Sequence, residues 1–96
     1  MKDRFLPVRI FEYPVPVAAE RRGTTYESEY GYLYSTMLYP TPQRAASAGQ
    51  LEFGVEDFWI ATIRDGQLAA FIHHATQRPH PVDLATHQAR LEWIWT

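Results

Sequence analysis

An Asp65-Gly66 dipeptide separates two apolar runs, 58–64 and 67–74. A two-residue Asp-Gly loop between such runs is a strong β-hairpin signal, because both loop positions favour the positive φ angles of a tight turn. Counting outward from the loop predicts Arg64 opposite Gln67, then the pairs Ile63–Leu68, Ala61–Ala70, Trp59–Ile72 and Asp57–His74. Ile60 and Phe71 form an apolar pair on the opposite face, so apolar pairs fall on both faces. This predicts a hairpin at the centre of a sheet that is covered on both sides.

The N-terminal third predicts a strand followed by a break. Residues 5–13 are rich in strand formers. Pro14 and Pro16 cannot donate backbone hydrogen bonds, so this stretch is expected to be an extended connector and not a central strand. Residues 18–22 are expected to form one helical turn, closed by Gly23.

One short helix is predicted near 42–48. Thr41 is a favourable N-cap residue, and Pro42 occupies the first helical position, where a missing N–H costs nothing. Gly49 is expected to end this helix.

The C-terminal segment has two interpretations. A helix capped by Asp83 fits its Ala-Arg-Leu-Glu composition, whereas the alternation that brings Trp93 and Trp95 to one face is typical of a strand. We expect a helical turn near 83–86 followed by a strand over 88–95. Its two tryptophans would pack in the core, or the terminal strand would pair with a second copy and form a homodimer.

These elements together predict one α+β domain over residues 1–96. We expect a mostly antiparallel sheet of about five strands, the central 58–64/67–74 hairpin and one short helix near 42–48.

Tyrosine marks the segment 24–39, which holds five of the six tyrosines of the chain. In a strand, side chains alternate between two faces. One face would carry Tyr26, Tyr30, Tyr32 and Tyr34, and the other would carry Glu27, Glu29, Leu33 and Met37. The tyrosine face either packs on the short helix or is exposed for recognition, since tyrosine gives a large contact area for little lost rotamer entropy.

Composition excludes several classes of site. The chain has no cysteine, so disulfides, zinc-thiolate sites and a cysteine nucleophile are ruled out. A net charge of −2 gives no global attraction to nucleic acid. The N-terminus lacks a signal-peptide pattern, and no segment approaches the roughly 20 apolar residues that span a bilayer. We therefore expect a cytoplasmic protein with no membrane contact and no cofactor.

The four histidines, His73, His74, His80 and His87, lie within fifteen residues. Their spacing matches no recognised metal site, and neighbouring strand residues such as His73 and His74 point to opposite faces. We expect no metal site.

The predicted register places Asp57 beside His74. A carboxylate next to an imidazole fixes its tautomer and raises its pKa, which is half of a general-base arrangement. No nucleophile motif accompanies this pair, so an enzyme is not favoured. The alternative function is that of a small enzyme or ligand-binding protein that uses the Asp57–His74 pair. This pair could lie at the interface of a dimer.

The favoured hypothesis is a small non-enzymatic module, such as an inhibitor, adaptor or accessory factor, that binds another protein. Its contact residues would be Tyr26, Glu27, Glu29, Tyr30, Tyr32 and Tyr34. Binding of single-stranded nucleic acid by base stacking is a third, less favoured alternative, because Glu27 and Glu29 would repel phosphate.

Overall fold

The computed structural model describes residues 2–20, 23–34 and 37–96, with the backbone alone described for 15–20 and 23–28. The elements in chain order are β1 (Arg4–Glu20), β2 (Gly23–Tyr34), α1 (Pro42–Phe53), β3 (Trp59–Arg64), β4 (Gln67–His73), α2 (Leu84–Leu91) and the 3-10 helix η1 (Glu92–Ile94). They form an α+β domain with one antiparallel sheet. The four strands have the order β2-β1-β3-β4, so the expectation of about five strands and one helix is only roughly met.

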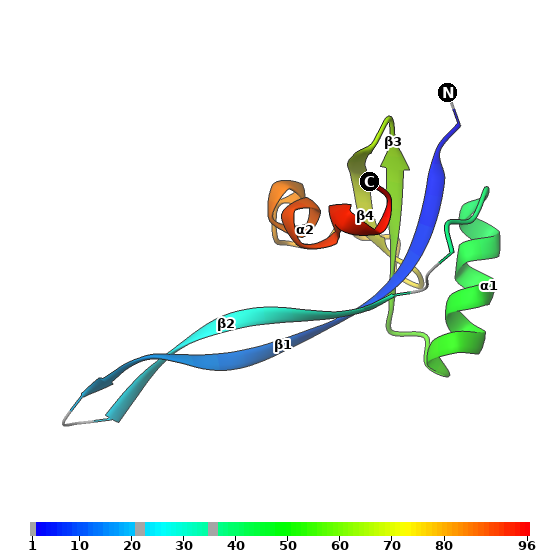
Figure 1. Ribbon diagram of the computed structural model, residues 1–96. Helices are drawn as coiled ribbons and strands as arrows, with labels where there is room; N and C mark the ends of the chain where they lie inside the picture. The colour runs from blue at the N-terminus through cyan, green and yellow to red at the C-terminus, as the bar shows by residue number, and fades with distance from the viewer. Residues whose placement is uncertain (1, 21–22, 35–36) are drawn as a thin grey trace.

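Two parts of the molecule differ in construction (Figure 1). β1 pairs with β3 only over Arg4–Val8, and it pairs with β2 from Val8 to Glu20. Residues 9–20 and 23–33 therefore form a two-stranded ribbon that projects from the rest, and we call this ribbon the arm and the remainder the body. The arm raises the radius of gyration to 15.2 Å, against about 12.5 Å for a compact chain of this length.

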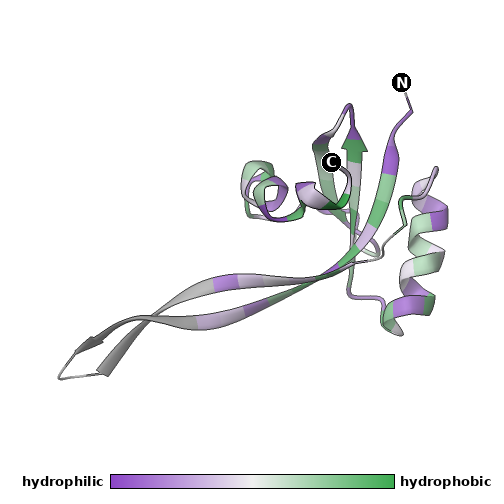
Figure 2. Ribbon diagram, viewed as in Figure 1, coloured by the Kyte–Doolittle hydropathy of each residue, from purple (hydrophilic) through white to green (hydrophobic). Residues whose placement is uncertain are grey.

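The body has a helix on each face of the sheet (Figure 1). α1 packs on β1 and β3 on one side, and α2 packs on β4 on the other. The α2 side buries Leu6, Val8, Ala61, Ile63, Leu68, Phe71 and Leu91, and the α1 side buries Ala45, Phe58 and Ile60. Figure 2 shows hydrophobic residues along the body strands between the two helices. The prediction that both faces of the hairpin are covered is confirmed, although β4 itself lies at the edge of the sheet.

The start of α1 is as predicted, and its end is not. Thr41 accepts a hydrogen bond from the Arg44 backbone N–H (3.2 Å), with Pro42 at the first helical position. The helix continues to Phe53 and ends at Gly54, whose φ is 67°. Gly49 lies inside the helix because its missing side chain makes room for Phe58, since a Cβ there would come within 2.4 Å of the ring.

The hairpin register departs from the simple count. Asp65 and Gly66 both have positive φ, and Ile63 pairs with Leu68 as expected. One extra residue on β4, Ala69, then shifts the pairing, so the further pairs are Thr62–Ala70, Ala61–Phe71, Ile60–Ile72 and Trp59–His73. This β-bulge turns Phe71 toward α2, where only 1% of it stays exposed.

The C-terminal segment is helical, and the expected strand over 88–95 is wrong. Asp83 caps α2 by accepting from the Thr86 backbone N–H (2.9 Å). The helix brings His87 and Leu91, four residues apart, to its buried face. η1 follows directly, so Trp93 and Trp95 do not form a pairing edge for a second copy.

The proline segment belongs to the arm. Pro14 and Pro16 lie within β1, opposite Ser28 and Tyr26 of β2, and the pairing is irregular between Pro16 and Ala18. Prolines fit here because the outer edge of a ribbon needs no N–H donor. The expected helical turn over 18–22 is wrong for Ala18–Glu20, which are strand, and its last two residues lie outside the described chain. Of the helices described, none is long and apolar enough to cross a membrane.

Candidate functional site

The tyrosine face of β2 turns toward α2 and η1. Tyr30, Tyr32 and Tyr34 are half-buried there. Tyr34 and Trp93 meet edge to face with ring centroids 5.3 Å apart. The side chains of two other expected contact residues, Tyr26 and Glu27, lie outside the described residues.

Tyr32 begins a chain of hydrogen bonds. Its hydroxyl lies 2.7 Å from His87 Nδ1, and His87 Nε2 lies 3.0 Å from His80 Nδ1. The Val82 backbone N–H donates to His80 Nδ1 (3.2 Å), so that nitrogen accepts. His87 Nε2 is then the donor to His80, and a neutral His87 accepts the Tyr32 hydroxyl proton at Nδ1.

The hydrogen-bonded network of Tyr32, His87 and His80 is uncharged at neutral pH. His87 is fully buried and stacks on Phe71 (4.6 Å between ring centroids). Burial, helped by the neighbouring His80, lowers the pKa of His87 to about 4. Burial also lowers the pKa of His80 and raises the pKa of the Tyr32 phenol. The network therefore attaches α2 to β2 through uncharged groups.

Asp57 pairs with His73, and the predicted Asp57–His74 pair is wrong. The β-bulge pairs His73 with Trp59 and so brings His73 to the face of the sheet expected for His74, with His73 Nε2 3.0 Å from Asp57 Oδ1. His73 Nδ1 accepts from the backbone N–H groups of Ala75 and Thr76 (3.1 and 3.2 Å). Both ring nitrogens are engaged, so His73 closes a turn and lacks a free basic nitrogen.

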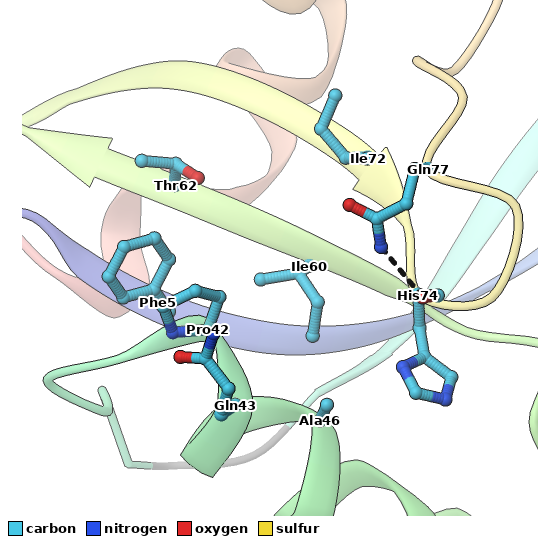
Figure 3. Close-up of a pocket in the computed structure, with 9 residues that line it drawn as sticks. All are labelled: Phe5, Pro42, Gln43, Ala46, Ile60, Thr62, Ile72, His74 and Gln77. Carbon is cyan, nitrogen blue, oxygen red and sulfur yellow. Dashed lines mark hydrogen bonds between the residues drawn. The ribbon is translucent and has the colours of Figure 1, made fainter.

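His74 lies on the opposite face of the sheet. Its ring stacks on Phe58, with centroids 4.5 Å apart and planes 7° apart, and its Nε2 lies 3.2 Å from Gln50 Nε2. It borders an open pocket of about 340 Å³ between α1 and the sheet (Figure 3). The pocket is lined by Phe5, Pro42, Gln43, Ala46, Ile60, Thr62, Ile72, His74 and Gln77. Within the described ranges, no cluster of three potential metal ligands occurs.

A second exposed surface lies on the arm, on the face away from α2. Phe11, Tyr13 and Leu33 are 39%, 44% and 51% exposed. Arg9 places its guanidinium 4.9 Å from the Phe11 ring centroid, and Glu29 reaches over the β2 edge to Arg90 (3.9 Å). We call Phe11, Tyr13 and Leu33 the arm patch. Sequence reasoning missed it, although the alternation Arg9-Phe11-Tyr13 was the available signal.

Comparisons with known proteins give no relative: no family model, no curated protein and no solved structure matches this chain.

Proposed function

We propose that this chain is a small non-enzymatic module that binds another protein, and that the arm makes the contact. One observation carries the proposal, namely that the arm projects from the body with an apolar patch exposed. Isolated two-stranded ribbons are at best marginally stable in water. A partner that covers the arm patch would stabilise the extended arm at the same time.

The distribution of unpaired strand edges supports the arm as the contact surface. The outer edge of β4 is occupied, because His73 N–H donates to Arg78, His80 N–H donates to Phe71, and Leu68 N–H donates to the Gln88 side chain (2.9, 2.9 and 2.8 Å). In the described part of the arm, the backbone hydrogen bonds run only between β1 and β2. An added strand would therefore find unpaired backbone groups on the arm and not on β4.

The tyrosines divide between two roles in this proposal. Tyr32 and Tyr34 hold the base of the arm against α2 and η1. Tyr30 also meets the rings of His80 and His87 edge to face. Together with Glu29, Tyr26 and Glu27 it lies farther along β2, where these residues would border the partner. Glu12 and Glu29 disfavour a phosphate-bearing ligand at the arm, so a protein partner fits better than single-stranded nucleic acid.

The test is photocrosslinking in an extract of the native host. A benzoyl-phenylalanine at position 11 or 33 should crosslink to one discrete protein, whereas the same group at Leu84, which is 37% exposed on α2, should not. Leu33→Asp should then weaken binding of that protein at least tenfold and leave the melting temperature within a few degrees. Equal crosslinking from all three positions, or none, would refute the proposal.

A second copy of the chain is the homodimer form of this proposal. Sedimentation over a hundredfold range of concentration distinguishes it, since a dimer formed through the arm would dissociate on dilution and in Leu33→Asp.

A further inference from the structure

The face of the sheet beneath α1 is only partly covered. α1 packs mainly on β1 and β3, and the remaining space beside the helix is the pocket shown in Figure 3. Ile60 and Ile72 form its floor, and Ala46 of α1 forms a wall. We propose that this pocket binds a small, uncharged aromatic molecule.

The pocket excludes charge from its ligand. None of its lining residues is Asp, Glu, Lys or Arg. A charged group inside would lose hydration without gaining a counterion, which disfavours its binding. An uncharged ligand avoids this cost and gains from covering the two isoleucines.

Aromatic side chains stand at two ends of the floor. Phe5 lies at one end and His74 at the other, with Ile60 between them (Figure 3). Rings in these positions can contact a flat ligand edge to face or by offset stacking. The shape therefore favours a planar ring over a branched aliphatic ligand.

Polar groups surround this apolar floor. The Thr62 hydroxyl and the Gln43 amide line the pocket. Gln77 donates from Nε2 to the His74 carbonyl oxygen (2.9 Å), which leaves its own side-chain oxygen as an acceptor. A ligand with a neutral amide or ring N–H could be held by these groups, which is the usual arrangement of small-molecule sites.

The His74 end of the pocket is preformed. The ring is held by its stack on Phe58, and Phe58 is fully buried. Because an amide nitrogen can only donate, Gln50 Nε2 donates to His74 Nε2, and the proton of neutral His74 lies on Nδ1. Binding would then require little ordering of this wall.

A titration followed by amide NMR tests the proposal, with benzamide as the probe. We expect saturable shifts centred on the backbone amides of Ala46, Ile72 and Gln77. Benzoate and benzylammonium have a similar shape and carry a charge, and they should bind at least tenfold more weakly. Non-saturable shifts, shifts centred elsewhere, or equal binding of the charged probes would overturn the proposal.

Two variants locate the site. Ala46→Leu should fill the pocket and reduce benzamide affinity at least tenfold, whereas Ala48→Leu, on the same helix but facing a different groove, should leave it unchanged. Thr62→Val preserves the side-chain volume and should weaken binding several-fold, and it decides the question if Ala46→Leu does not fold. Equal benzamide affinity in Ala46→Leu and Ala48→Leu would place the ligand elsewhere. If Ala46→Leu does not fold, an unchanged affinity in Thr62→Val would do the same.

Discussion

The body of this protein has a helix on each face of its sheet and an occupied β4 edge, whereas the arm has an exposed apolar face and unpaired edges. Both parts share strand β1, and the exposure of its side chains differs between its α2-facing side in the body and its opposite side in the arm. Leu6 and Val8 are fully buried in the body, and Phe11 and Tyr13 are exposed in the arm. Apolar and aromatic residues of the same strand thus pack in a core in the body and remain exposed for contact in the arm.

The difference predicts where stability lies. Burial of apolar surface is the main favourable term in folding, and the body holds all of the fully buried side chains described. The arm adds long-range backbone pairing and little buried surface. We therefore expect the arm to open at lower free energy than the body.

The largest expected effect comes from a pair of phenylalanines. Phe58 is fully buried in the body and Phe11 is 39% exposed on the arm. Phe58→Ala should lower the free energy of unfolding by about 3–5 kcal/mol, and Phe11→Ala by less than about 1 kcal/mol. Urea denaturation of both variants measures this. Comparable losses would mean that the arm patch is covered in solution.

Low pH should weaken the packing of α2 against the base of the arm, where His87 contacts Tyr32. The pKa of His87 is lowered from 6.5 to about 4. Between these pH values the unfolded chain binds a proton that the folded chain does not, so the free energy of unfolding falls as the pH decreases from 6.5 to 4. The full loss is at most about 3 kcal/mol.

Urea denaturation at several pH values between 4 and 7 measures this slope. Burial also lowers the pKa of His80, which contributes with the same sign. The slope should be smaller in His87→Leu, and an unchanged slope in that variant would show that His87 is not its source.

Substitution of one glycine in the body and one in the arm tests the same contrast. A Cβ on Gly49 would lie 2.4 Å from the Phe58 ring, whereas a Cβ on Gly31 of the arm would lie 3.3 Å from Tyr13. Gly49→Ala should cost about 1–3 kcal/mol of stability through overpacking. Gly31→Ala should cost less, because the exposed Tyr13 ring can move. Thermal denaturation compares the two, and a larger cost at Gly31 would contradict the proposed contrast.

The smallest expected effect concerns one hydroxyl. Tyr32→Phe removes the donor to buried His87 and should cost about 1–2 kcal/mol. Tyr34→Phe is the matched control, since the Tyr34 hydroxyl has no hydrogen-bond partner among the described residues, and it should be near neutral. Equal values in urea denaturation would show that the Tyr32–His87 bond contributes nothing to stability.

Local signals predicted part of this fold correctly. The Asp65-Gly66 turn, the Thr41-Pro42 helix start and the extended tyrosine segment as far as Tyr34 each follow from backbone preferences of a few neighbouring residues, although the predicted strand over 24–39 is wrong for residues 37–38. Asp83 as a cap was also visible. The predicted helix ends too early, near residue 86, because the alternation over 88–95 favours a strand in a segment whose composition favours a helix.

The candidate sites were harder to predict because they depend on contacts between distant residues. The contact of Tyr32 with His87 joins residues 55 apart in the chain, and the pocket joins both strands of the hairpin to α1. The Asp57–His74 pair was lost through a single extra residue at Ala69, since a one-residue shift exchanges the faces of every residue beyond it.

The sequence by itself determined the turns, the helix starts and the alternation of the strands, because these depend on the φ preferences and hydrogen bonding of adjacent residues. Only the tertiary structure decided which faces are covered. The bulge at Ala69, the packing of Phe58 against Gly49, and the end of β1–β3 pairing at Val8 depend on how apolar surfaces from different elements fit together. That fit leaves the arm patch and the pocket beside α1 open.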